Sequence, residues 1–428
     1  MPDLISESYW KQGGGKPAGD QGNLSTECDV AIIGAGFTGL AAALHLVRAG
    51  RSVVVLEAYD IGHGCSGRSG GMCGPSFHKL GVQGLTKRYG EAKAWEILRE
   101  SLASLDYFFS FVAAEDIDCD LQFVGRFRGA ATAREYNALV KDSALLADKI
   151  GLKFHAVPRD MQRAEIGTDL YHGGVVYERD AGLNPYKLVT GLASRAAAAG
   201  CRIFENCAVQ GIDHKGPFKS LQTRRGEIRT KTVIIATNGY TGPEFPYFRR
   251  RLIPVTAGVV ATEDLGPQKI REISPKLRMH GGTHRLVFWY RPTPDGRRMI
   301  FGGRVMDRKR RPGPVSDDLM TLARRVFPQL ENAQAEYCWQ GDVAYTFDHA
   351  PHLGEVDGIH FAMGYCGSGI TRSLYFARQL SRRILGQADD TTAHDDLKFT
   401  TMPFYSGNPW FMPFVLRWHA LMDKVAGH

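Results

Sequence analysis

A Gly-x-Gly-x-x-Gly pattern near the start of the chain carries the clearest chemical signal. Residues 34–39 read Gly-Ala-Gly-Phe-Thr-Gly, between an apolar run and a stretch with helical spacing. In such a motif the first glycine permits a tight turn, the second lets the backbone approach a diphosphate, and the third lets helix and strand pack closely. The free N–H groups at the helix N-terminus attract the phosphates. The pattern predicts a dinucleotide site built by Gly34, Gly36, Phe37, Thr38 and Gly39.

A carboxylate completes this predicted site. Glu57 follows the next apolar run, 52–56, which we interpret as a second buried strand. Together with the run at 29–33 and the helical stretch at 40–49 it makes a βαβ unit. A carboxylate at that strand end accepts hydrogen bonds from both hydroxyls of a ribose.

A second glycine-rich loop, residues 62–71, indicates which dinucleotide binds. A nicotinamide enzyme does not need such a loop directly behind the acidic residue. FAD does, because its diphosphate and long ribityl chain require further backbone amides, with a hydroxyl and an arginine near the phosphates. The predicted cofactor is therefore FAD, with contacts in this loop from Ser66, Arg68, Ser69, Gly70 and Gly71.

These motifs resemble the FAD-dependent amine oxidases of the D-amino acid oxidase and glycine oxidase superfamily, and most of all its γ-glutamylputrescine oxidase-like branch. In that branch Ala-Ser-Gly-Arg-Asn-Gly-Gly follows the strand that ends in Glu; here residues 65–71 read Cys-Ser-Gly-Arg-Ser-Gly-Gly, with Ser69 in place of Asn. The stretches 232–240 and 339–370 extend the resemblance, which spans most of 9–388. It implies further FAD contacts at Val209, Thr237, Gly364, Gly367, Gly369, Ile370 and Thr371.

The C-terminal part of the resemblance has a physical explanation. A predicted buried strand, 360–363, leads into the glycine-rich turn 364–370 and then a helix that begins near Thr371. This arrangement presents a second helix N-terminus with exposed amides. In the family it lies beside the pyrimidine edge of the flavin, where negative charge collects when the ring is reduced, so the donors favour hydride acceptance.

Two departures from the family pattern restrict the prediction. D-amino acid and glycine oxidases carry an Arg two residues after the Gly of Trp-x-Gly, and it binds the substrate carboxylate; here Val343 stands there. This counts against a simple α-amino acid held in that way. Sarcosine-type relatives attach flavin through a Cys in this region, but Cys338 lies several residues upstream of the matching position. We therefore predict noncovalent FAD.

The substrate side offers aromatic and basic candidates rather than a motif. Oxidation of an amine by flavin needs mainly positioning, so no acid–base residue is compulsory. An arginine, Arg291 or Arg304, can bind a distal carboxylate by a bidentate fork. The predicted catalytic residues are Tyr365, Arg304, His78 and Tyr290, and further candidates for the pocket are Tyr240, Trp289 and Arg291.

The expected reaction is oxidation of a C–N bond of a primary or secondary amine to an imine, which then hydrolyses to a carbonyl. The donor is an amino acid, an N-alkyl amino acid or a polyamine derivative, and oxygen as acceptor gives hydrogen peroxide. One alternative keeps the cofactor but passes electrons to a quinone at a membrane. Another, prompted by the net charge of +8, is an RNA-modifying flavoprotein.

The elements that hold these residues predict an α/β fold: a Rossmann-like FAD-binding domain interleaved with an antiparallel-sheet substrate domain. The FAD-binding domain is assigned to 27–84, 185–250 and 335–388, and the substrate domain to 85–184 and 251–334. Residues 1–26 are polar and glycine-rich and predict a flexible arm, with Tyr9 and Trp10 as the residues that pin part of it to the body. The tail, 389–428, is rich in aromatic residues; it packs against the body or a partner subunit, or touches a membrane surface.

Composition excludes several classes of protein. Hydrophobic residues make up 43% and charged residues 23% of the 428, which excludes extensive disorder. The eight cysteines show no Cys-x-x-Cys, and the start lacks the features of a signal peptide. No apolar run reaches the roughly 18 residues of a membrane helix, so we expect a cytoplasmic protein.

Basic residues fall in short runs, so no nucleic-acid partner is expected. The histidine pairs 280/284 and 349/352 lack further ligands, so no metal is predicted either. The oligomeric state stays open.

Overall fold

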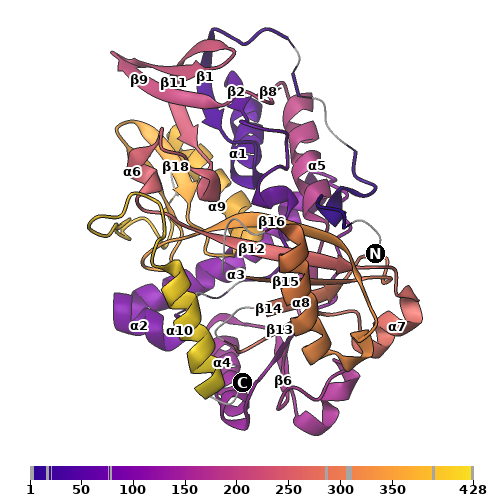
Figure 1. The fold of residues 1–428 in the computed structure, drawn as a ribbon. Helices are drawn as coiled ribbons and strands as arrows, with labels where there is room; N and C mark the ends of the chain where they lie inside the picture. Colours follow the sequence, from indigo (N-terminus) through magenta and orange to yellow (C-terminus); the bar gives the residue numbers. More distant parts are fainter. Residues whose placement is uncertain are drawn as a thin grey trace.

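Two large β-sheets, one above the other, organise the chain (Figure 1). The structure is a computed structural model and describes residues 4–15, 19–20, 22–75, 77, 80–284, 288–304, 311–387 and 391–425.

The first sheet has the strand order β17-β18-β11-β1-β2-β8. Neighbours from β18 to β8 run parallel, β17 pairs antiparallel with β18, and the β9–β10 hairpin extends β11. The bounds are β1 (Glu27–Ile33), β2 (Val53–Leu56), β8 (Arg202–Phe204), β9 (Val209–Lys215), β10 (Phe218–Thr223), β11 (Gly226–Ile235), β17 (His352–Val356) and β18 (Ile359–Met363).

Alternate residues of this sheet pack into different cores, which explains the continuous apolar runs of β1 and β2. Val30 and Ile32 belong to the core formed with helices α1, α5 and α9, whereas Ala31 and Ile33 pack toward the hairpin and α6. The helices are α1 (Phe37–Arg48), α5 (Pro185–Ala198), α6 (Pro246–Arg249) and α9 (Gly369–Ile384).

The carboxyl ends of the central strands align. Ile33 is paired with both Leu56 and Ile235, and Ile235 is paired with Phe361. The segments that follow β1, β2, β11 and β18 therefore leave the sheet at one edge, where ligands bind in open α/β sheets.

The second sheet has the order β16-β12-β15-β14-β13-β4-β6-β5 and is antiparallel except for the pair β13–β4. One face packs under α8 (Pro312–Val326). The other face packs into the core that the first sheet forms with α1, α5 and α9. The strands are β4 (Arg126–Gly129), β5 (Phe154–Val157), β6 (Gly174–Tyr177), β12 (Ile253–Thr262), β13 (Met279–Gly282), β14 (Phe288–Pro292), β15 (Met299–Arg304) and β16 (Ala335–Tyr345). The predicted α/β fold with a nucleotide-binding sheet and an antiparallel substrate sheet is confirmed.

The remaining helices surround these sheets. Long α3 lies against α9 within the same apolar core, and the Thr132 hydroxyl accepts a hydrogen bond from the Glu135 N–H at the start of α4. The bounds are α2 (Gly81–Tyr89), α3 (Glu91–Ala114), α4 (Ala133–Ile150), α7 (Gly266–Ile273) and α10 (Met412–Val425), and a small sheet joins β3 (Met72–Cys73) to β7 (Ala181–Gly182). No helix within these described ranges has the length and apolarity that crossing a bilayer demands.

Two segments lie differently from where the sequence placed them. Residues 335–345, assigned to the FAD-binding domain, form β16, which pairs with β12 along its length in the second sheet. Residues 4–15, in the predicted flexible arm, rest on the body over more of their length than the expected anchors Tyr9 and Trp10: Ile5 bridges to Tyr337, and Trp10 is completely buried. Both placements come from contacts with residues more than 50 positions away in the sequence.

Candidate active site

In the turn after β1 the backbone of the first turn of α1 lies directly against the backbone at the end of the strand. Gly34 has a φ of +105°, a conformation that favours glycine. A Cβ built on Gly39, in the first turn of α1, would lie 2.0 Å from the Gly34 carbonyl oxygen. The helix can therefore begin directly over the end of β1 only because residue 39 has no side chain, and its N-terminus faces the sheet edge.

Glu57 connects β2 to this turn. Its carboxylate accepts hydrogen bonds from the Ala35 N–H at 2.8 Å and the Tyr59 N–H at 3.0 Å. Burial raises the pKa of the Glu57 carboxyl, and the backbone donors oppose that shift. A largely buried carboxylate at the end of the second strand is the group that a ribose diol requires.

The second glycine-rich loop is bound on both sides. The Ser66 hydroxyl accepts a hydrogen bond from the Phe37 N–H at 3.1 Å, which joins the loop to α1. On the other side Arg68 donates to the Gln340 carbonyl at 3.0 Å, and the Trp339 indole donates to the Arg68 carbonyl at 2.8 Å. The loop thus links the nucleotide turn to β16 of the second sheet.

The N-terminal segment, which the motif analysis did not assign to the site, fastens the same loop. The Ser8 hydroxyl donates to the Gly67 carbonyl at 3.1 Å, and the Trp10 indole donates to the Ser69 carbonyl at 2.7 Å. Asn184 in turn donates to the Trp10 carbonyl at 3.1 Å. The adjacent aromatic residues Tyr9 and Trp10 in a polar stretch were the only available signal.

The turn before α9 completes the arrangement. The Gly364 N–H donates to the Asn238 side chain at 2.9 Å, and Thr237 follows the end of β11 beside Gly34. The Tyr365 hydroxyl lies 2.7 Å from the Thr38 hydroxyl in α1. The N-termini of α1 and α9 therefore meet through this buried pair, and Asn238 is a participant that the motifs did not reveal.

Tyr365 is positioned within this turn rather than in an open pocket. It is buried, and its hydroxyl also donates to the Ala362 carbonyl at 3.3 Å. Its contacts join α1 to the end of β18, which leads into α9. This placement indicates that Tyr365 positions α1 relative to α9.

Tyr290 lies away from the cofactor loops, and its placement does not support the catalytic role expected of it. It is fully buried in the core under α8, where its hydroxyl lies 2.7 Å from that of Tyr171 and its ring stacks on His280. The side chains of a strand alternate between faces, so Trp289 takes the opposite side. The predicted catalytic Tyr290 therefore lies on the α8 side of the strand, away from the glycine-rich loops.

Trp289 occupies the side that faces the second loop. A Cβ on Gly302, its cross-strand partner, would lie 2.0 Å from the indole, and a Cβ on Gly70 would lie 2.4 Å from it. The ring therefore lies between the second glycine-rich loop and β15, where the two sheets and their helices meet.

The Arg291 side chain binds backbone carbonyl groups. It is buried and donates to the carbonyls of Gly71 at 2.6 Å, Leu183 at 3.1 Å and Pro292 at 3.1 Å. Burial lowers the pKa of this guanidinium to about 10. Its N–H groups hold the loop, and they leave no free pair of donors for a bidentate contact with a distal carboxylate. Arg304 is the last residue of β15 and pairs with Ala257, while His78 lies outside the described residues.

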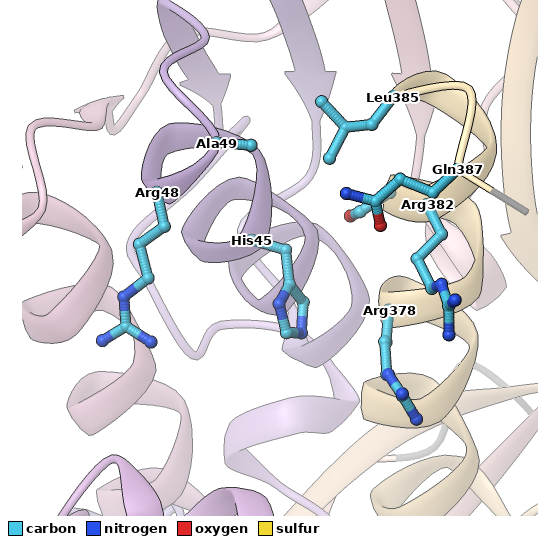
Figure 2. Close-up of a pocket in the computed structure, with 8 residues that line it drawn as sticks. His45, Arg48, Ala49, Arg378, Arg382, Leu385 and Gln387 are labelled. Atoms are coloured by element: carbon cyan, nitrogen blue, oxygen red, sulfur yellow. The ribbon is translucent and has the colours of Figure 1, made fainter.

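Two surface hollows lie apart from this arrangement. One, of about 460 Å³, lies between the C-terminal ends of α1 and α9, at the opposite end of α1 from the glycine motif (Figure 2). Figure 2 shows His45, Arg48, Arg378 and Arg382 around it. Another, of about 520 Å³, is lined by Arg159, Asp160, Gln162 and Asp169. The close backbone approaches, and not these hollows, locate the candidate site.

The histidines with metal-like spacing have protein partners. His352 lies 3.1 Å from an Asp348 carboxylate oxygen, and His280 lies 2.8 Å from the Ser274 hydroxyl. In the portion of the chain that the structure describes, no three His, Cys, Asp or Glu side chains are grouped to hold a metal ion.

Comparison with known proteins decides the family. A family model described as "FAD dependent oxidoreductase", DAO, matches residues 29–383. The chain belongs to the DAO family. A γ-glutamylputrescine oxidoreductase of Escherichia coli (strain K12) is 30% identical over 427 residues, covering 98% of this chain and 99% of that protein. A probable oxidoreductase OrdL of Haemophilus influenzae is 30% identical over 390 residues, covering 86% of each.

Solved structures share the DAO family fold. A glycine oxidase from Geobacillus kaustophilus superposes with a TM-score of 0.73 at 21% identity, over 89% of this chain and 99% of that one. An L-proline dehydrogenase from P. horikoshii gives a TM-score of 0.70 at 17% identity, over 86% and 96% of the two chains. At these identities the likeness supports the fold.

The residues of this DAO family member fit FAD. The Ser69 hydroxyl oxygen is buried and has no hydrogen-bond partner, although an unpaired buried hydroxyl costs stability. It lies in the loop where a ligand's polar groups are expected. The next two residues are Gly70 and Gly71, where an added Cβ would collide with Trp289 and with the Leu183 carbonyl oxygen. The protein is an FAD-dependent oxidoreductase, as the motifs predicted.

The position of Cys338 agrees with noncovalent FAD. Cys338 is buried in the core on the α8 side, where its thiol donates to the Pro312 carbonyl at 3.3 Å. The neighbouring Trp339 points the other way, to the second loop. Strand alternation therefore directs Cys338 away from the cofactor loops.

Proposed function

We propose that this enzyme oxidises a C–N bond of a primary or secondary amine to an imine, which hydrolyses to a carbonyl. The observation that carries the proposal is the indole of Trp289, which lies between Gly70 of the cofactor loop and Gly302 of the second sheet. An aromatic side chain of the substrate lobe thereby reaches the FAD-binding loop, where a small substrate must be held.

The proposed cofactor site follows the aligned strand ends. The start of α1 takes the diphosphate, Glu57 takes the ribose, and the second loop supports the remaining length. The turn before α9 takes the flavin end. The contacts are Gly34, Gly36, Phe37, Thr38, Gly39, Glu57, Ser66, Arg68, Ser69, Gly70, Gly71, Val209, Thr237, Gly364, Gly367, Gly369, Ile370 and Thr371.

The chain's own groups then have limited tasks. Bound FAD supplies the electron acceptor for the C–H bond beside the nitrogen. The amides at the start of α9 stabilise negative charge at that end of the site, helped by the helix dipole. Trp289 shapes the pocket and excludes water, which favours a neutral, correctly oriented amine.

The missing carboxylate clamp favours a particular class of amine. Val343 stands where family oxidases carry an arginine, and its backbone pairs with Val255 inside the sheet. Arg291 is held by carbonyls, which leaves Arg304 as the candidate for a distant carboxylate. We propose an amine whose carboxylate, where present, is remote from the reacting nitrogen, as in an acylated polyamine. The 30% identity to a γ-glutamylputrescine oxidoreductase supports this class.

Oxygen is the proposed acceptor, with hydrogen peroxide as product. The aromatic tail favours one alternative, electron transfer to a quinone at a membrane. Oxygen consumption with substrate, compared with dye reduction under argon, distinguishes them. All eight cysteines are free, which supports the proposal of a reducing, cytoplasmic compartment.

Anaerobic bleaching of the flavin absorbance tests the proposal. A panel contains acylated and free polyamines, N-alkyl amino acids and simple amino acids. We expect rapid bleaching by an acylated polyamine and slow bleaching by glycine. Protein that releases no flavin on denaturation, or holo-protein that no amine bleaches, would refute the proposed function.

A further inference from the structure

The outer face of α10 carries a continuous stripe of large apolar side chains. Phe414, Trp418 and Leu421 follow one another in α10 at intervals of four and three residues, so they share a face, and Trp410 lies in the turn just before the helix. Their exposed fractions are 61%, 66%, 59% and 52%. Isolated exposed apolar residues are ordinary, but an aligned group marks an interaction surface.

The same segment also has partners in the body. Leu416, on the opposite side of the helix, is only 2% exposed, and Phe411, which precedes the helix, packs with Tyr405, Ile253 and Val255. The helix is thus anchored to the body by one apolar face and presents a second. Figure 1 shows α10 on the outside of the molecule, away from the first sheet.

Charge identifies the kind of partner. Residues 397–425 contain one acid, Asp423, against the basic residues Lys398, Arg417 and Lys424, and Lys398 and Arg417 are exposed. The segment also lies on the arginine run after α6: Arg251 donates to the Phe399 carbonyl at 2.8 Å, and Arg250 is exposed. The preceding acids, Asp395 and Asp396, are paired with Arg383 and Lys93. The stripe therefore lies in a basic surrounding.

A second copy of the chain fits this surface poorly. A two-fold contact presents the same patch from both subunits. It would bring Arg417 of one copy toward that of the other, with no acidic residue between Trp410 and Leu421 to pair it. Anionic lipid supplies the missing negative charge, and tryptophan side chains prefer the interface between headgroups and acyl chains.

We infer that the C-terminal stripe docks the protein on an anionic membrane surface, with Trp410, Phe414 and Trp418 inserted at the level of the headgroups. The contact is peripheral and reversible, because one short amphipathic face gives only moderate affinity. It does not depend on the proposed amine chemistry, since lipid binding is measured without substrate.

Vesicle flotation of the FAD-loaded protein tests the inference. We expect the wild-type protein to float with phosphatidylglycerol vesicles, less with phosphatidylcholine vesicles, and less in high salt. The triple variant W410S/F414S/W418S is expected to bind at least about tenfold more weakly. The matched control is Phe123→Ser, which removes a 65% exposed aromatic ring elsewhere, against Phe109, and should bind as the wild type does.

Each outcome supports or overturns the inference. Flavin absorbance and circular dichroism show whether the triple variant is folded. In a second measurement, brominated lipids should quench the wild-type tryptophan fluorescence, and W410F/W418F should lose that quenching while still floating. Failure of the wild type to float, equal flotation of the triple variant, or a dimer that this variant converts to monomer without any vesicle binding would each overturn it.

Discussion

Gly39 and Gly302 face the same steric limit on opposite sides of the candidate site. A Cβ on either would lie 2.0 Å from a neighbouring atom, but the neighbours differ: the Gly34 carbonyl oxygen on the cofactor side and the Trp289 indole on the substrate side. A carbonyl in a strand-to-helix turn cannot move without moving the sheet or the helix. An indole can rotate or shift. The position of residue 39 on the cofactor side is therefore fixed by the main chain. On the substrate side the neighbour is a side chain, which can adjust its position.

The largest effect is expected at Gly39. Gly39→Ala forces α1 away from the end of β1, so we expect loss of bound FAD and a fall of about 3 kcal/mol in the free energy of unfolding. Flavin absorbance per protein and denaturant unfolding measure both. Gly211→Ala, at a position with open space and ordinary backbone, is the control. A Gly39→Ala protein that stays yellow and equally stable would show that the turn is adjustable too.

The counterpart on the substrate side is Gly302→Ala. We expect FAD to be retained, because only the Trp289 ring is displaced, while kcat/KM falls about tenfold, or about 1.4 kcal/mol. The double variant W289F/G302A should recover part of this loss, since the smaller ring leaves room for the Cβ. Loss of FAD from Gly302→Ala, or no rescue by the second change, would contradict the comparison.

A smaller effect on the cofactor side is expected at Trp10. Trp10→Phe removes the donor to the Ser69 carbonyl, at a cost of about 1 kcal/mol. FAD affinity, measured by fluorescence titration of the apoprotein, should fall roughly fivefold. Trp95→Phe removes an indole N–H that faces a surface carboxylate, Glu91, and should leave the affinity unchanged. Equal affinities in the two variants would show that the N-terminal segment does not position the loop.

The smallest effect concerns pH. Burial raises the pKa of Glu57, so this carboxyl takes up a proton at a higher pH than an exposed one. Only the ionised form accepts hydrogen bonds through both oxygens, and FAD affinity should therefore weaken as pH falls through the raised pKa. Glu57→Gln should bind FAD more weakly at neutral pH and lose this pH dependence. Parallel pH profiles for variant and wild type would rule out Glu57 as the source.

Adjacent residues of β14 show why the substrate side resisted prediction. Trp289, Tyr290 and Arg291 all bear side chains suited to a pocket. In the fold Trp289 reaches the cofactor loop, Tyr290 enters the core under α8, and Arg291 binds three carbonyls. Which face of a strand meets the other lobe depends on sheet packing, and residue types do not reveal it.

The βαβ unit of the first sheet was predictable because its geometry is local. A tight turn, a close helix start and a terminal carboxylate must occur within one βαβ unit, so 34–39 and Glu57 leave a compact signature in the chain. The tertiary structure alone decided that Ser8 and Trp10 hold the second loop, that β16 belongs to the second sheet, and that one face of α10 stays uncovered. These features depend on contacts between distant segments, and such contacts are set by how whole elements pack.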